Sequence, residues 1–118
     1  MQLEFDITQS FNDDLNYLSE EDKKKIKDQI NFVSGSLLNG KEAFFENTSK
    51  PYLFKLKENL ESSLYVIKAD NKRIVAAVDE DPIFDKLSFT LFRITDKENA
   101  EQVYREIGEI IYKHSGIL

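Results

Sequence analysis

Apolar and polar residues alternate with two different periods along the chain, and these periods predict its secondary structure. Leu3, Phe5 and Ile7 are separated by polar residues, which predicts a short strand with one buried face. Apolar residues then recur at helical spacing, which predicts two helices, the first capped by Thr8 and the second by Ser19. We expect these two helices to form an antiparallel hairpin.

After Pro51 the apolar period changes to two, which is typical of strands. Short turns divide this region into predicted strands over residues 52–57, 64–69, 72–79 and 87–94. Residues 79–82, Asp-Glu-Asp-Pro, predict a turn, and residues 95–98, Thr-Asp-Lys-Glu, predict a capping box that opens a last helix. The residues expected to face inward in that helix are Ala100, Val103, Tyr104, Ile107, Ile110 and Ile111.

The order of these elements predicts an α+β fold: an N-terminal strand, a helical hairpin, an antiparallel meander of about four strands, and a C-terminal helix. A chain of 118 residues is expected to form one domain, over residues 1–118. Apolar residues make up 41% of the chain and charged residues 32%, a balance typical of a folded globular protein.

Several kinds of chemistry are disfavoured by the residues that the chain lacks. It has no cysteine, and its glycines are scattered rather than gathered in a phosphate-binding loop. The acidic residues between positions 79 and 85 do not have the spacing of a calcium loop, and His114 is placed to complement a helix C-terminus. We therefore expect no metal and no cofactor.

The apolar runs are too short to span a membrane, and the N-terminus lacks the pattern of a signal peptide. We expect a cytoplasmic protein of bacterial type. The formal net charge of −6 disfavours a general nucleic-acid binder, because phosphate contacts need clustered cations. Residues 50–73, however, carry six Lys or Arg against three Asp or Glu, so one local region is basic.

The stretch LYVIKADNKRIVAAV, residues 64–78, concentrates part of this basic charge in a predicted hairpin. A two-residue turn at Asp70 and Asn71 would set Lys68 directly opposite Arg73. Like charges at such positions are destabilising. Two interpretations remain open: solvated cations that protect a strand edge, with Asp70 relieving the repulsion, or cations that converge on a phosphate and stabilise the transition state of RNA cleavage.

The same region carries a resemblance to a known family. The segments YLFKLKENLESSLYVIKADNKRIVAAVDED and FTLFRITDKENAEQVY, together with the order of elements, resemble the RelE/ParE superfamily of toxin–antitoxin toxins. The resemblance implies an antitoxin protein as partner. For the RNA-cleaving members of that family it further implies metal-independent endoribonuclease activity on ribosome-bound mRNA.

Residue by residue, the resemblance assigns roles to the basic positions and to one tyrosine. Lys68 and Arg73 would stabilise the phosphate in the transition state, and Tyr104 would assist proton transfer. Lys55 and Lys57 would bind RNA. Lys97, which follows the last strand, is added to this RNA-binding group.

The chain departs from the family pattern in ways that keep other functions open. It has Asp96 and Lys97 where many members carry His-Arg, and Lys72 stands before Arg73 in place of the usual aromatic residue. Its net charge is also negative. The alternatives are a ParE-like protein that inhibits by binding without chemistry, and a family member without toxicity that acts as a protein-binding module. We expect an antitoxin helix to dock through its apolar face.

Overall fold

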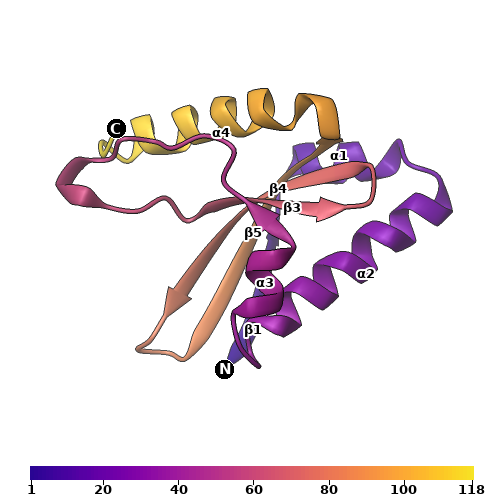
Figure 1. The fold of residues 1–118 in the computed structure, drawn as a ribbon, viewed down its shortest axis with the longest axis horizontal. Helices are drawn as coiled ribbons and strands as arrows, with labels where there is room; N and C mark the ends of the chain where they lie inside the picture. Colours follow the sequence, from indigo (N-terminus) through magenta and orange to yellow (C-terminus); the bar gives the residue numbers. More distant parts are fainter.

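The computed structural model describes residues 1–118 and shows one five-stranded sheet with helices on both faces (Figure 1). The strands lie in the order β1-β5-β4-β3-β2. The elements, in chain order, are β1 Gln2–Ile7, α1 Gln9–Asn16, α2 Glu20–Ser36, α3 Glu42–Glu46, β2 Thr48–Ser49, the 3-10 turn η1 Lys57–Asn59, β3 Leu64–Ala69, β4 Lys72–Asp81, β5 Lys86–Asp96, the 3-10 turn η2 Lys97–Asn99, and α4 Ala100–His114.

The α+β class is confirmed, as are the N-terminal strand, the two helices after it and the C-terminal helix. The central strands β3, β4 and β5 form the antiparallel meander. The sheet as a whole is mixed, because β1 pairs with β5 in parallel. Helices α1 and α2 both contribute to the core on one face of the sheet, with α1 packed beside β5.

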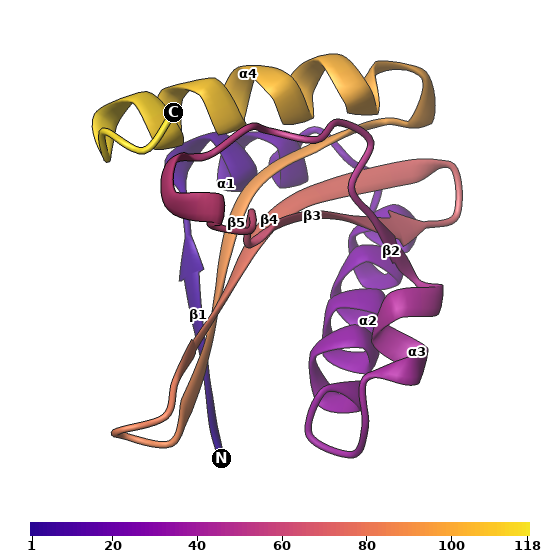
Figure 2. The same ribbon diagram turned by 60° about the vertical axis from the view of Figure 1, so that its left-hand side comes forward.

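Two hydrophobic clusters lie on opposite faces of the sheet. On the first face, Phe11 of α1 and Ile26, Ile30 and Val33 of α2 pack against the sheet. On the second face, α4 covers the sheet, with Tyr104 fully buried. Figure 2 shows this layering, with α4 on one side of the sheet and α2 and α3 on the other.

The predicted strand over residues 52–57 is wrong. Its residues belong to a long connection between β2 and β3, residues 50–63, which we call the covering segment. This segment follows α4 toward the C-terminus before it returns to the sheet (Figures 1 and 2). Its turn at η1 contains Glu58 and Asn59, which both have positive φ angles near 60°. The short strand β2 takes the place beside β3 instead.

The alternating apolar residues of the covering segment pack on α4 rather than in the sheet. The ring of Phe54 lies 5.7 Å from the ring of Tyr104 and 5.3 Å from that of Tyr112, measured between centroids. It also lies against Gly108, where an added Cβ would collide with the ring. Gly108 therefore lets Phe54 seat closely on the helix, and the period of two does not require a strand here.

Two strand ends, the cap of the last helix and one of its inward positions differ from the sequence prediction. Strand β4 continues to Asp81, so the turn begins only at Pro82. Strand β5 continues to Asp96, which keeps Thr95 in the ladder opposite Arg73, and no side-chain capping bond opens η2 or α4. Within α4, Ile110 is 61% exposed and does not face the sheet. Continued pairing of β4 with β5 outweighed the turn signal at residues 79–81 and the cap signal at Thr95.

Candidate functional site

The β3–β4 hairpin has the register predicted from the sequence. Asp70 and Asn71 form the turn, and Asp70 has a φ angle of 58°. Lys68 pairs with Arg73 across the two strands, and Ala69 pairs with Lys72. The two cations therefore occupy directly opposed positions. They lie on the face of the sheet that also carries α4, one step beyond the last apolar pair that the helix covers.

The backbone at the turn holds Arg73 in place. Its Nη1 donates to the carbonyl oxygens of Asp70 at 2.7 Å and of Lys72 at 2.8 Å. The Asp70 carboxylate points elsewhere, with Oδ2 3.6 Å from Nζ of Lys25 on α2. This carboxylate therefore forms its ion pair with α2 and none with Lys68 or Arg73. Lys68 is exposed and forms no ion pair.

A third basic residue of the predicted set, Lys97, lies at the same end of the sheet. The amide of Lys97 donates to the carbonyl oxygen of Asn71 at 3.2 Å, which ties η2 to the hairpin turn. An acidic group lies here as well, because Asp96 Oδ1 is 2.6 Å from Nζ of Lys72. The hydrogen bond to Asp96 raises the pKa of Lys72. The cations at this end of the sheet are thus partly balanced by a carboxylate.

Lys55 and Lys57 lie far from the hairpin. Both belong to the covering segment, and the amide of Lys57 donates to the carbonyl oxygen of Ile117, just past the C-terminal end of α4, at 2.7 Å. Lys97 opens η2, the turn that immediately precedes the N-terminal end of the same helix. A helix of 15 residues spans roughly 22 Å at 1.5 Å per residue. The structure therefore separates the predicted RNA-binding lysines into two groups at opposite ends of α4.

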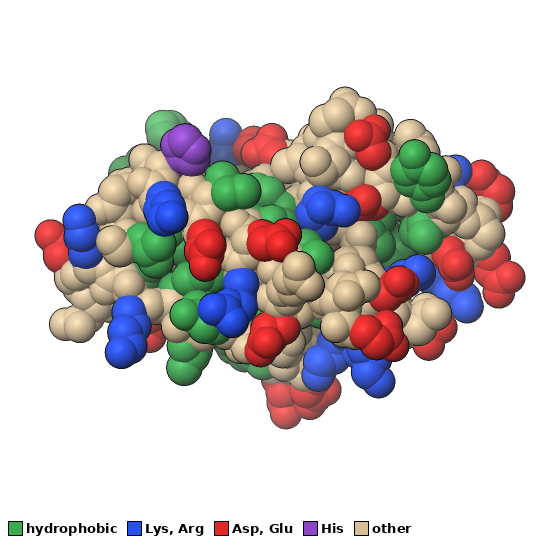
Figure 3. All heavy atoms as spheres, turned by 90° about the horizontal axis from the view of Figure 1, so that it is seen from above, with side chains coloured by type: hydrophobic (Ala, Val, Ile, Leu, Met, Phe, Trp, Pro, Cys, Tyr) green, Lys and Arg blue, Asp and Glu red, His purple; other side chains and the backbone are tan.

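The surface above α4 shows no continuous basic patch. In Figure 3 basic and acidic side chains are interspersed over this face. Helix α4 itself carries the acidic residues Glu101, Glu106 and Glu109 close to Arg105. A single-stranded RNA would meet carboxylates between the two groups of lysines.

Tyr104 lies in the core. Its side chain is fully buried, and its hydroxyl donates to the carbonyl oxygen of Leu64 at 2.7 Å. Burial raises the pKa of Tyr104 to about 12. In this position the phenol joins α4 to the start of β3, and a substrate at the surface does not reach it.

No group of three or more His, Asp or Glu side chains is arranged to hold a metal ion. None of the helices combines the length and the apolar character that crossing a bilayer would require.

A further surface, which the sequence analysis did not single out, lies between β1 and α2. An open apolar groove of about 290 Å³ runs along it. Its apolar lining consists of Phe5, Ile7, Phe11, Leu15, Ile26, Ile30 and Leu91. Phe5 is 39% exposed and Ile7 59% exposed, so the predicted buried face of this strand is only partly covered. The alternation of residues 3–7 was the available signal, but it does not show whether a neighbouring element covers the strand.

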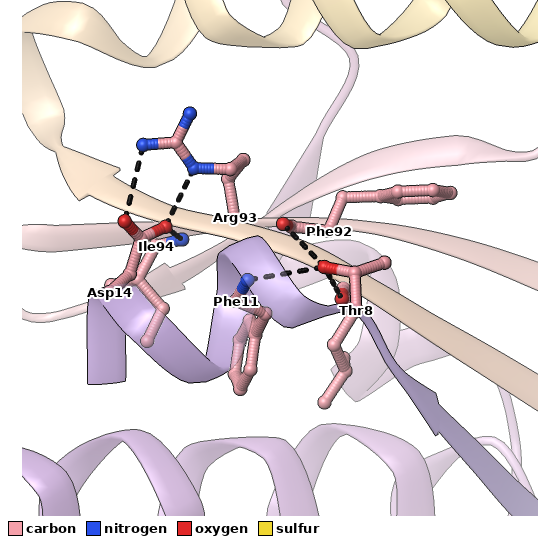
Figure 4. A network of polar contacts seen from close by, with 7 residues as sticks. Thr8, Phe11, Asp14, Phe92, Arg93 and Ile94 are labelled. Atoms are coloured by element: carbon pink, nitrogen blue, oxygen red, sulfur yellow. Dashed lines mark hydrogen bonds and ion pairs between the residues drawn. The ribbon is translucent and has the colours of Figure 1, made fainter. Parts of the chain in front are cut away.

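Beyond the end of β1, the edge of β5 is closed by polar groups of α1 (Figure 4). The Thr8 hydroxyl caps α1 by accepting the Phe11 amide at 3.1 Å. One turn later, Asp14 accepts the Ile94 amide at 2.9 Å and binds Arg93 through Nε at 2.7 Å and Nη2 at 3.1 Å. The hydrogen bond to Asp14 raises the pKa of Arg93. This part of the sheet edge is therefore satisfied, whereas β1 itself remains an edge strand.

Comparisons with known proteins place the chain beside a solved structure. No protein-family model matches the chain, and no curated protein matches it. The chain is similar to a chain in the crystal structure of the RelB–RelE antitoxin–toxin complex from Methanococcus jannaschii. The two share 19% sequence identity with a TM-score of 0.45, and the match covers 83% of this chain and 96% of the other.

Proposed function

We propose that this protein is the RelE/ParE-like component of a toxin–antitoxin pair and that it acts by binding a protein partner without cleaving RNA. The toxin–antitoxin class is supported by the sequence resemblance of the β3–β4–β5 meander and of the helix after it. Within that class, the arrangement of the predicted site residues favours the binding mode over the nuclease mode.

The distance between the two groups of predicted cations is the observation that favours binding over RNA cleavage. Cleavage by the family's scheme would need Lys55 and Lys57 to hold RNA beside Lys68 and Arg73. The two groups lie at opposite ends of α4, and Tyr104 is buried beneath the helix. General acid–base catalysis needs its group within hydrogen-bonding reach of the reacting atom. A binding mode requires only an exposed complementary surface, and the apolar groove beside β1 offers one.

RNA cleavage is the second candidate, and one observation favours it. Lys68 and Arg73 face each other across the hairpin, and Arg73 uses only one of its guanidinium nitrogens on the turn carbonyls. Its other donors remain free for a phosphate. An anion bound between the two side chains would also offset their mutual repulsion.

Bacterial growth after induction of this protein alone tests the proposal. We would compare the wild type with the Lys68→Ala/Arg73→Ala double variant and with a Lys41→Ala/Lys113→Ala control. The control removes the same charge from two exposed positions outside the hairpin. Circular dichroism and immunoblotting would confirm folding and equal expression.

The proposed binding mode predicts that all three proteins arrest growth. Relief of the arrest by the hairpin variant alone would replace the proposal with the RNA-cleaving candidate, and mapping of mRNA ends would follow. Normal growth with the wild-type protein would contradict the toxin role itself and would support the non-toxic binding module.

A further inference from the structure

Strand β1 has one unpaired backbone edge. Its pairing with β5 decides which N–H and C=O groups lie on that edge. The amide of Gln2 donates to the Asp85 carbonyl oxygen at 2.9 Å, and the amide of Thr8 donates to the Leu91 carbonyl oxygen at 3.2 Å. Even-numbered residues of this segment therefore direct their backbone groups toward β5. Because backbone direction alternates along a strand, Leu3, Phe5 and Ile7 direct their N–H and C=O groups outward.

No hydrogen bond of the structure engages these outward groups. An edge of this kind is a template for a further strand. The same odd-numbered residues place their side chains on the groove side of the sheet, where Phe5 stacks on Phe89 with ring centroids 5.6 Å apart. Ile7 and Phe5 expose apolar surface next to the open edge. An added strand would thus form hydrogen bonds with the outward N–H and C=O groups of Leu3, Phe5 and Ile7. Its side chains would cover the groove that Phe5 and Ile7 line.

The other face of β1 is acidic and decides what kind of strand fits. Glu4 and Asp6 point away from the groove, and Glu4 is paired with Lys86 at 3.1 Å. Asp6 is exposed and forms no ion pair. A strand laid along β1 would place alternate side chains beside these carboxylates, where Lys or Arg would be favourable.

A second copy of this chain does not fit this edge. Two copies related by a two-fold axis would pair β1 with β1 antiparallel, the usual symmetry of a dimer. The two registers that keep the apolar side chains on one face and pair five residues of β1 set Glu4 of one copy opposite either Glu4 or Asp6 of the other. Like charges in direct opposition are destabilising. The carboxylates thus act against self-pairing while leaving the edge open to a basic strand.

We propose that β1 accepts an extended segment of a protein partner as a sixth strand of the sheet. In this segment, apolar residues that enter the groove alternate with Lys or Arg residues that face Glu4 and Asp6. The inference rests on the proposed partner-binding function and names the chemistry of the partner. It differs from docking of a partner helix, because a helix would leave the outward backbone groups of Leu3, Phe5 and Ile7 unpaired.

Selection from a displayed library of random 12-residue peptides tests this inference on the full-length protein. The most enriched peptide would be synthesised and used as the probe in titrations. Strand addition predicts that enriched sequences alternate apolar with basic residues. It also predicts that the bound peptide slows hydrogen exchange at the amides of Leu3, Phe5 and Ile7.

Two variants separate the backbone and charge contributions. Ile7→Pro removes one outward N–H without touching the ladder to β5, because that amide does not pair with β5. We expect it to weaken peptide binding by about tenfold, the loss that corresponds to roughly one hydrogen bond. The matched Ile7→Val variant keeps the amide and should bind like the wild type. Asp6→Lys should weaken binding and reduce its dependence on salt.

Three results would overturn the inference: enriched peptides that lack the alternation, an Ile7→Pro variant that binds as tightly as Ile7→Val, or exchange protection confined to other residues. If Ile7→Pro fails to fold, the exchange pattern and Asp6→Lys decide between the outcomes. The two proposals fail separately. Normal growth after induction would contradict the toxin role and would leave strand addition at β1 standing. Peptides that bind elsewhere would contradict strand addition and would leave the toxin role standing.

Discussion

Replacement of Asp14 by alanine is expected to destabilise the protein far more than its position on a short surface helix suggests. Asp14 accepts three hydrogen bonds, two from Arg93 and one from the backbone amide of Ile94, and its side chain is only 19% exposed. The Ile94 amide lies at the edge of β5 beyond the end of β1, so no neighbouring strand can replace the lost acceptor.

The magnitude follows from these contacts. A hydrogen bond from a partly buried amide to a carboxylate contributes about 1.5 to 3 kcal/mol. The ion pair adds less, because the Arg93 side chain is 41% exposed and exposed pairs contribute about 0.2 to 1 kcal/mol. We therefore expect Asp14→Ala to lower the free energy of unfolding by about 2 to 3 kcal/mol. Alanine is the better helix former, which makes the sign of the result informative.

Urea unfolding followed by circular dichroism measures this change as a shift of the midpoint at constant slope. Asp13→Ala is the matched control, because it removes the neighbouring carboxylate, whose partner is the exposed Gln9 side chain at 2.8 Å. It should change the stability by less than about 0.5 kcal/mol. Equal effects of the two substitutions would refute the reasoning, as would a double-mutant cycle with Arg93→Ala that shows no coupling.

Two further substitutions test the packing on the α4 face. Burial raises the pKa of Tyr104 to about 12, above the unfolded value of about 10. The neutral phenol therefore contributes fully to the free energy of unfolding below pH 10, and this contribution is lost as the pH rises toward 12. Tyr104→Phe should therefore cost about 1 kcal/mol at neutral pH and abolish an alkaline loss of about 2 to 3 kcal/mol, measured by urea unfolding across that range; an unchanged alkaline slope would contradict the assignment. Gly108→Ala should destabilise the protein by about 1 to 3 kcal/mol, because the added methyl group collides with Phe54. Gly108→Ala combined with Phe54→Leu should recover part of that loss in thermal unfolding, and no recovery would show that the ring is not the obstacle.

The hairpin illustrates what local sequence can determine. The register of Lys68 against Arg73 followed from two apolar strands separated by two turn residues, and the structure has that register. The helical stripe of α4 was equally readable, with the exception of Ile110. In both elements, the pattern that predicts which side chains share a face lies within a few residues, because side-chain direction repeats with the backbone period.

The covering segment illustrates where that period is ambiguous. The alternation around Phe54 has the same appearance as a strand, but the ring packs between Tyr104 and Tyr112, whose positions depend on a helix some fifty residues later in the chain. The space beside Gly108 that receives the ring exists only after α4 has packed on the sheet. Sequence periodicity identifies a face to be buried and does not identify the element that buries it.

The sequence by itself determined the α+β class, the hairpin register and which residues carry charge. Only the tertiary structure decided which of these residues are neighbours. It placed Lys57 and Lys97 at opposite ends of α4, and it left β1 at the edge of the sheet with Phe5 and Ile7 exposed. The physical reason is that strand order and helix packing are long-range choices, made by the whole core, whereas the pattern along the chain reports only the local preference of each segment.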